Sequence, residues 1–249
     1  MCKTIDPNVI SYLRQTENCV ISTGAGVSVE SGIPTFRDAL TGFWSNYDPM
    51  TLATPTGFRK DPKLVWEWYR FRQGLVMKTK PNPGHYAIAE MEKMFAEFLL
   101  ITQNIDGLHH RAGSRNLVEI HGNIHRYKCF QEETIVDPLP ESDEVPPRCP
   151  NCGSYIRPDV VWFGEQLPME GLEKAEQAIT SCDTLISVGT SGAVYPVALF
   201  PAQAKHYGAF VIEINLEETP ISEIADVSLL GKSGEILPQL VKELKKARE

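Results

Sequence analysis

The sequence predicts an α/β fold, with a doubly wound, Rossmann-like parallel sheet and a smaller inserted module. Two observations predict this class. Short β-branched apolar runs alternate with helical patterns along most of the chain, and each run ends in small or polar residues. Continuous apolar strands suit a parallel sheet that helices cover on both faces, and such sheets bind ligands at the carboxyl ends of their strands. The length of 249 residues allows one large domain or two small ones.

The expected strands and helices follow one another in a regular order. The strands are Cys19–Ser22, Phe98–Thr102, Leu117–Ile120, Thr184–Val188, Phe210–Ile214 and Val227–Leu230. The helices are roughly Pro7–Thr16, Gly84–Ala96, Gly171–Ser181, Ala198–Tyr207, Thr219–Ile224 and Glu235–Ala247. Together they make up the predicted dinucleotide-binding domain, which comprises residues 1–36, 81–126 and 161–249.

Two segments interrupt this alternation, and we predict that they form the small module. Residues 37–80 are rich in aromatic side chains and have a helical pattern. Residues 127–160 hold three of the six cysteines and the polar, proline-rich stretch DPLPESDEVPP, which has no helical period.

Composition excludes several functional classes. With Lys+Arg 24 against Asp+Glu 32, the net charge of −8 opposes non-specific nucleic-acid binding, which needs clustered cations. No apolar run reaches the roughly 18 residues that span a bilayer, so no membrane association is expected. The start lacks the pattern of a secretory signal, so we expect a cytoplasmic protein. In that compartment cysteines bind metals or stay buried more often than they form disulfides.

A glycine-rich segment, TGAGVSVESG at residues 23–32, follows the first strand. Gly24 and Gly26 would let the backbone turn sharply and approach a pyrophosphate at a helix N-terminus. The full dinucleotide fingerprint fails because position 29 is Val29. Read alone, the segment is equally a simple glycine-rich turn.

Polar clusters follow four further strands, at TQNIDGLH (102–109), EIHG (119–122), GTSG (189–192) and NLE (215–217). Amide and carboxylate side chains there suit hydrogen bonds to a sugar and a carboxamide, and Glu217 could accept from ribose hydroxyls. His121 ends one such run, where a histidine is also commonly a structural residue. The clustering at strand ends favours a binding site.

Six motifs in order resemble those of the sirtuins, the family of NAD-dependent protein-lysine deacylases. They are GAGVSVESGIPTFR at 24–37, TQNIDGLHHRAG at 102–113, EIHG at 119–122, VVWFGE at 160–165, GTS at 189–191 and NLE at 215–217. The resemblance runs from about Asn18 to Leu240, which is nearly the whole chain. It implies a Rossmann-like fold, NAD consumed as a co-substrate, one structural zinc ion and acylated-lysine protein or peptide substrates.

The resemblance also implies a role for each motif residue. His121, Asn104 and Asp106 would be catalytic, with His121 as the general base and the other two lining the nicotinamide pocket. NAD would be bound by Gly24, Ala25, Gly26, Ser28, Phe36, Arg37, Gln103, Asn104, Ile105, Asp106, Gly189, Thr190, Ser191, Asn215, Leu216, Glu217 and Ser233. The substrate peptide would pair as an added strand with Val160, Val161, Trp162 and Phe163.

The implied chemistry needs a base near neutral pH. In the family the acyl-lysine carbonyl oxygen attacks C1′ of the nicotinamide ribose and expels nicotinamide. A ribose hydroxyl must then lose its proton to attack the resulting imidate, and a histidine suits that step at pH 7. The expected products are nicotinamide and 2′-O-acyl-ADP-ribose.

The cysteines depart from the family pattern. Cys149 and Cys152 form a Cys-x-x-Cys-Gly knuckle, which is a zinc-ligand spacing. Sirtuins carry a second such knuckle, but here Cys129 is followed by Glu132 where the fourth cysteine belongs. We therefore expect zinc on Cys129, Cys149 and Cys152, completed by a carboxylate or a water. A metal-free loop with buried thiols is the alternative.

The segment WEWYRFR at 66–72 bears on the acyl group. Tyr69 and Arg72 stand three residues apart and share one helix face. Read without the resemblance, this is an amphipathic helix with a solvated arginine. It also resembles the Tyr-x-x-Arg pair of the sirtuin subclass that removes succinyl and malonyl groups, and Thr35 fits that subclass. A guanidinium beside a phenol suits a carboxylate at the end of an acyl chain.

The sequence thus predicts an NAD-dependent protein deacylase that removes succinyl or malonyl as well as acetyl groups. A plain deacetylase and an ADP-ribosyltransferase are the enzymatic alternatives. A catalytically silent NAD-binding module is opposed by the presence of His121 and Asn104. A zinc-ribbon nucleic-acid binder is opposed by the negative charge and the single intact knuckle.

Overall fold

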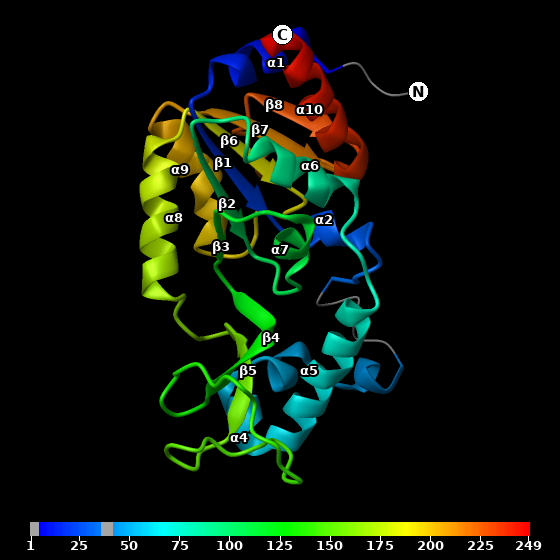
Figure 1. Cartoon of the computed structure of the whole chain (residues 1–249), viewed down its shortest axis with the longest axis vertical. Coiled ribbons are helices and arrows are strands. Elements are labelled where there is room, and N and C mark those ends of the chain that lie inside the picture. The colour runs from blue at the N-terminus through cyan, green and yellow to red at the C-terminus, as the bar shows by residue number, and fades with distance from the viewer. Residues whose placement is uncertain (1–4, 36–41) are drawn as a thin grey trace.

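The fold was analysed in a computed structural model, which describes residues 5–35 and 42–249. Its main sheet has six parallel strands in the order β3-β2-β1-β6-β7-β8 (Figure 1). In chain order these are β1 (Asn18–Thr23), β2 (Glu97–Thr102), β3 (Leu117–Glu119), β6 (Thr184–Val188), β7 (Phe210–Asn215) and β8 (Val227–Leu230). The strand order reverses between β1 and β6, which is the switch point where doubly wound sheets bind ligands.

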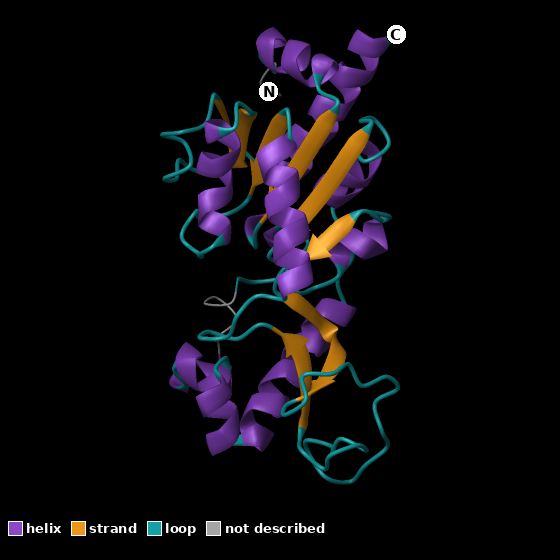
Figure 2. Ribbon diagram, turned by 90° about the vertical axis from the view of Figure 1, so that its left-hand side faces the viewer, coloured by secondary structure: helices purple, strands orange, loops and turns teal. Residues whose placement is uncertain are grey.

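Helices cover both faces of this sheet, as Figure 2 shows. One core cluster packs α1 (Pro7–Gln15), α6 (Pro83–Met91) and α10 (Ser233–Arg248) onto one face. A second cluster packs α8 (Met169–Ser181), η2 (Val197–Leu199) and α9 (Phe200–His206) onto the other. Along β1, Cys19 and Ile21 join the first cluster while Val20 joins the second. The predicted Rossmann-like sheet is therefore confirmed, with alternate strand residues buried on opposite faces.

A second, antiparallel sheet pairs β4 (Gly122–Cys129) with β5 (Ile156–Val160), and sequence analysis predicted neither strand. It lies at the far end of the molecule from the C-terminus, next to α4 and α5 (Figure 1). Six helical segments complete the described part of the chain: α2 (Gly26–Val29), η1 (Gly42–Asn46), α3 (Pro49–Leu52), α4 (Pro55–Lys60) and α5 (Pro62–Met77), with α7 (Leu108–Ala112) between β2 and β3. An aromatic core that includes Trp44, Phe58, Trp68 and Trp162 joins α3–α5 to β4 and β5. The predicted domain boundaries stay a prediction.

Local sequence explains where α5 begins. Asp61 accepts a hydrogen bond from the amide of Leu64 at 2.9 Å, and Pro62 occupies the first helical position. A side-chain acceptor before the helix and a proline at its start are both favourable there. This fixes the helix that carries Tyr69 and Arg72.

One predicted helix is wrong. Residues 219–224 form turns, not a helix, and the reason lies in a buried carboxylate on β7. Glu213 accepts hydrogen bonds from the hydroxyls of Thr219 at 2.5 Å, of Ser228 at 3.0 Å and of Ser222. These bonds favour turns over a regular helix, because the hydroxyls of Thr219 and Ser222 must both point toward Glu213 on β7. The predicted helix at 84–96 also ends early, at Met91.

No helix in the described part of the chain is both long and apolar enough to cross a membrane.

Candidate active site

The glycine-rich turn after β1 meets the turn after β6 at the switch point. A Cβ on Gly24 would lie 2.7 Å from the carbonyl oxygen of Gly189, and one on Gly26 would lie 2.8 Å from it. The amide of Gly26 donates to that same oxygen at 2.8 Å. The amide of Val27 donates to the carbonyl of Gly24 at 3.3 Å, so the chain turns here, although neither glycine has positive φ. Close backbone packing is what requires glycine here. The helix that follows is a single turn.

A buried polar network lies beside this turn. Asn104 donates to the carbonyl of Gly24 at 3.0 Å and to the hydroxyl of Ser28 at 3.1 Å. Ser28 in turn donates to Asp106 at 2.7 Å, and the amide of Leu108 donates to the same carboxylate at 2.8 Å. Burial raises the pKa of Asp106, while these hydrogen bonds oppose the rise. The structure thus brings together Asn104 and Asp106, both expected in the nicotinamide pocket, and joins them through Ser28, which was expected to bind NAD.

Two buried histidines, which sequence analysis did not assign, lie behind the network. The ring of His85 is 4.7 Å from that of His109 and 3.4 Å from the hydroxyl of Ser28. Burial lowers the pKa of His85 to about 4 and lowers the pKa of His109 well below its usual value. Both rings are therefore neutral at pH 7. His109 lies within the motif at 102–113, whereas His85 lies in none of the six motifs.

His121 follows β3, and its ring orientation is fixed by one hydrogen bond. Its Nδ1 lies 3.1 Å from the carbonyl oxygen of Gln103. A carbonyl only accepts, so Nδ1 carries the proton and Nε2 is left as the basic nitrogen. Burial lowers the pKa of His121, although the bond to Gln103 opposes the shift. The imidazole is thus neutral at pH 7, as a general base must be.

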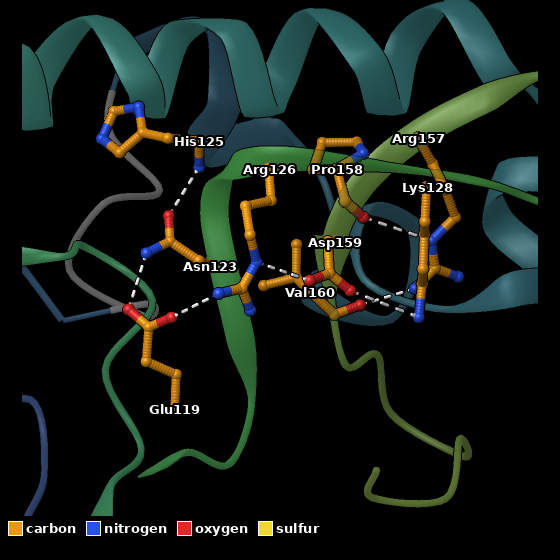
Figure 3. Close-up of polar contacts among 9 residues, drawn as sticks. All are labelled: Glu119, Asn123, His125, Arg126, Lys128, Arg157, Pro158, Asp159 and Val160. Atoms are coloured by element: carbon orange, nitrogen blue, oxygen red, sulfur yellow. Dashed lines mark hydrogen bonds and ion pairs between the residues drawn. The ribbon is translucent and has the colours of Figure 1, made fainter. Parts of the chain in front are cut away.

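Charged side chains on either side of position 121 in the sequence join the two sheets, and Figure 3 shows Glu119, Asn123, Arg126 and Asp159 among them. Asn123 donates to Glu119 at 2.6 Å, which closes the turn that contains His121. Arg126 bridges Glu119 at 2.7 Å and Asp159 at 2.9 Å. The bridge therefore ties the strand before His121 to the strand before the expected peptide-binding segment. Sequence analysis missed it, because no spacing signals a contact between residues 126 and 159.

The expected peptide-binding segment is held tightly from within the chain. The amides of Val161, Trp162 and Phe163 donate to the His121 carbonyl, the Glu165 carboxylate and the Ala53 carbonyl. A peptide that pairs with the segment through one of these amides must displace an existing bond.

The ion pair of Arg157 with Glu165 also holds that segment in place. Arg157 bonds Glu165 at 2.5 Å and 2.8 Å, donates to the carbonyl of Val160, and lies 3.5 Å from the ring centre of Trp162. Sequence analysis assigned no role to Arg157 or Glu165. Removal of either partner would leave a buried charge, which is strongly destabilising.

Tyr69 and Arg72 lie on one side of α5, as the spacing predicted. The hydroxyl of Tyr69 accepts a hydrogen bond from the indole Nε1 of Trp162 at 2.9 Å. The guanidinium of Arg72 lies 6.0 Å from the Tyr69 ring centre. Burial lowers the pKa of Arg72, opposed by Tyr69 and Asp106, and the side chain is partly buried, so its guanidinium is partly desolvated. The alternative of a fully solvated arginine is therefore wrong.

Further residues that were expected to bind NAD surround the end of β6. Gln103 donates to the Thr190 hydroxyl at 3.1 Å, and Asn215 donates to the Thr190 carbonyl at 2.9 Å. Of the other expected residues, Ile105 is partly buried, and four are exposed: Ala25, Ser191, Leu216 and Glu217. Phe36 and Arg37 lie outside the described residues.

The start of α10 is tied to the glycine-rich segment. Glu30 accepts from the Ser233 hydroxyl and from the Gly234 amide, both at 2.9 Å. A side chain distant in sequence thus caps this helix, whose own N-cap residue makes no side-chain bond. The sequence resemblance named Ser233 among the NAD-binding residues but did not point to Glu30.

Four potential metal ligands meet where β4 ends. The ligand atoms of Cys129, Glu132, Cys149 and Cys152 all lie within 4.8 Å of one another. Three thiols and a carboxylate at this separation fit a tetrahedral zinc ion. Every cysteine in the described ranges is free, as expected for a chain without disulfides.

A parallel sheet in this order, with polar side chains gathered at its switch point, defines a Rossmann-like α/β protein with a second, cysteine-bearing sheet. The chain belongs to the Sir2 family, whose model matches residues 24–196. The resemblance to sirtuins is therefore confirmed.

Named relatives extend over nearly the whole chain. It is 51% identical over 239 residues to NAD-dependent protein deacylase 2 of Pyrobaculum aerophilum, with 96% of each chain covered. A Sir2 homologue solved with NAD is 43% identical with a TM-score of 0.91, covering 98% of this chain and 96% of that one. A triple variant of a Sir2 homologue, solved with 2′-O-acetyl ADP ribose, is 44% identical with a TM-score of 0.89 over 98% of both chains.

Proposed function

We propose that this chain is an NAD-dependent protein deacylase that acts on acylated lysines and favours dicarboxylic acyl groups. Membership of the Sir2 family and the names of its relatives support the deacylase activity. The observation that carries the proposal is the neutral imidazole of His121. Its Nδ1 donates to the Gln103 carbonyl, which leaves Nε2 as the basic nitrogen. NAD is the co-substrate, as in the related NAD complex.

In this proposal His121 accepts a proton from a ribose hydroxyl through Nε2. Gln103 keeps the ring in the required tautomer, because its carbonyl holds the proton of Nδ1. Asn104 and Asp106, fixed through Ser28, line the nicotinamide pocket and orient the group that leaves. The acyl group would end on the ribose as 2′-O-acyl-ADP-ribose, a class of product bound by a related Sir2 homologue.

Tyr69 and Arg72 would recognise the acyl carboxylate. The hydroxyl of Tyr69 already accepts the indole proton of Trp162, so its own proton is directed away from that ring. Beside it, Arg72 supplies a partly desolvated guanidinium that a carboxylate would pair with well. A charged hydrogen bond contributes roughly 1.5–3 kcal/mol, which is about tenfold or more in kcat/KM.

Nicotinamide release tests the activity with acetyl-, succinyl- and malonyl-lysine peptides side by side. We expect His121→Ala to lower product formation about 10²–10⁴-fold while NAD still binds. His110→Ala is the matched control, because His110 is exposed on α7. Turnover in His121→Ala equal to the wild type would refute the assignment. ADP-ribosylation of the peptide in place of deacylation would favour the transferase alternative.

Acyl preference is tested by Arg72→Met in the same assay. We expect the succinyl and malonyl peptides to lose most of their advantage while deacetylation persists, because an acetyl methyl has no charge to pair. Arg70→Met on the same helix is the control, since Arg70 is exposed. Equal loss with all three peptides would make Arg72 a structural residue and the chain a plain deacetylase.

The remaining expectations stay predictions. We propose that the zinc ion is structural, because its four protein ligands leave no open position for a substrate. These expectations include the cytoplasmic location and the absence of nucleic-acid binding, which the net charge of −8 favours.

A further inference from the structure

The loop that begins at Cys149 has the backbone of a metal-binding knuckle. The amide of Cys149 donates to the carbonyl of Ser154 at 2.7 Å, and the amide of Gly153 donates to the carbonyl of Cys149 at 2.9 Å. Gly153 has a φ of +73°. The amide of Cys152 donates to the Cys149 sulfur, and this hydrogen bond contributes most to lowering the Cys149 pKa. These bonds fold the loop so that the Cys149 and Cys152 sulfurs lie within 4.8 Å of each other.

The loop that begins at Cys129 has the same hydrogen bonds with only one cysteine. The amide of Cys129 donates to the carbonyl of Thr134 at 2.9 Å, and the amide of Glu133 donates to the carbonyl of Cys129 at 3.0 Å. Glu133 has a φ of 56°, although it is not glycine. The amide of Glu132 donates to the Cys129 sulfur at 3.4 Å. Glu132 therefore stands where Cys152 stands in the other loop.

The side chains complete the match. The Cys129 and Cys152 sulfurs are 3.4 Å apart, and a Glu132 oxygen lies 3.8 Å from the Cys149 sulfur. Tetrahedral zinc with Zn–S of about 2.3 Å and Zn–O of about 2.0 Å places its ligand atoms about 3.5–3.8 Å apart. We infer that Glu132 is the fourth metal ligand, so that this centre is a Cys3Glu site rather than a four-cysteine site.

A carboxylate in this position changes which ions the centre prefers. Like a thiolate it carries one negative charge, so the total charge of the ligand set is that of four cysteines. Its oxygen is a harder donor than sulfur, and soft ions such as Cd²⁺ prefer sulfur donors. A four-cysteine centre therefore prefers Cd²⁺ to Zn²⁺, and a Cys3Glu centre should have a weaker preference for Cd²⁺.

The test uses the full chain and reads the metal itself. Zn²⁺ affinity is measured by competition with a chromophoric chelator, and the Co²⁺-substituted protein is measured by its thiolate-to-metal absorption. We expect Glu132→Ala to weaken Zn²⁺ binding about 10–100-fold, the range that perturbing metal sites commonly gives. Glu132→Cys should raise the thiolate-to-Co²⁺ absorption by about one third and favour Cd²⁺ over Zn²⁺ by about tenfold more.

Glu133→Gly is the matched control, because it removes the neighbouring carboxylate and keeps the positive φ. It should leave affinity and spectrum unchanged. If Glu132→Ala binds Zn²⁺ as the wild type does, or Glu132→Cys leaves the Co²⁺ spectrum unchanged, the fourth ligand is not Glu132. A wild-type chain that binds no stoichiometric Zn²⁺ also overturns the inference. Because turnover is not measured, failure here is distinct from failure of the proposed deacylase activity.

Discussion

The two sheets of this molecule are stabilised in different ways. The six-stranded sheet is enclosed by helices on both faces and buries two apolar clusters. The sheet of β4 and β5 has two strands, which alone are marginally stable in water. It relies on the aromatic core with α3–α5, on the pair of Arg157 with Glu165 and on the four metal ligands. Apolar packing on both faces stabilises the first sheet, whereas the second combines an aromatic core on α3–α5 with a buried ion pair and a cluster of potential metal ligands.

The two sheets should therefore respond to different perturbations. Removal of a specific ligand or contact should weaken the small sheet and leave the large one folded. Protonation of a buried group should do the reverse, because the buried histidines belong to the large sheet's network. His121 lies where the two regions meet, so its position depends on both.

Metal removal should have the largest effect. Structural zinc contributes about 10–16 kcal/mol of binding free energy in small zinc domains, so its loss should unfold the small sheet locally. Hydrogen exchange after chelation should show lost protection in β4 and β5 and retained protection in β1 and β2. Protection should return when Zn²⁺ is restored. Uniform loss in both sheets would show that they fold as one unit.

Gly122→Ala should come next, at the junction of the sheets. Gly122 has a φ of +80°, and an added Cβ would lie 2.1 Å from the carbonyl oxygen of Asp159. We expect a loss on the order of 4 kcal/mol in the free energy of unfolding, measured by denaturant titration. Gly208→Ala is the control, because its φ is +95° in open space and only the backbone cost of about 1–2 kcal/mol remains. Equal losses would mean that contact with Asp159 is unimportant.

Acid should destabilise the large sheet through His85. Its folded pKa is about 4 against 6.5 when unfolded, so the unfolded chain binds more protons between these values. Stability is therefore full above pH 6.5 and falls as the pH drops toward 4, by about 3 kcal/mol from this residue. His85→Gln should reduce the pH slope of the unfolding free energy by about 1.4 kcal/mol per unit in that window. An unchanged slope would contradict the assignment.

The smallest effect is expected for the bridge between the sheets. Arg126 is half-exposed, so Arg126→Met should cost about 1 kcal/mol or less. Hydrogen exchange should then show a larger difference between the opening free energies of the β4 amides and the β3 amides. Lys246→Met is the control, since Lys246 pairs with Glu243 within a single helix. No difference between the two variants would remove the bridge as a link.

The large sheet could be predicted because its strands are continuous apolar runs bounded by polar residues. The helix expected at 219–224 could not be excluded, because the hydroxyls of Thr219 and Ser222 bond Glu213 on a different element. The same limit applies to the strands β4 and β5, which contain too few apolar residues for a periodic signal.

For the candidate site, the sequence motifs identified the expected NAD-binding residues but not the side chains that hold those residues in place. The resemblance predicted that Asn104 and Asp106 share a pocket and that Ser28 binds NAD, and Ser28 is hydrogen-bonded to both of the other residues. The capping of α10 by Glu30 spans 203 residues, and no local pattern reports a contact of that range. The role of the fourth metal ligand was open for a similar reason, because only the folded loops show which atoms converge.

The contact between Glu30 and the start of α10 has a consequence for synthesis on the ribosome. Glu30 leaves the ribosome 203 residues before its partner Ser233. The strand β8 and helix α10 that complete the large sheet are also made long after the glycine-rich segment. A nascent chain therefore holds Glu30 without its partner while the intervening strands and helices are made, and the contact can form only after the start of α10 has emerged.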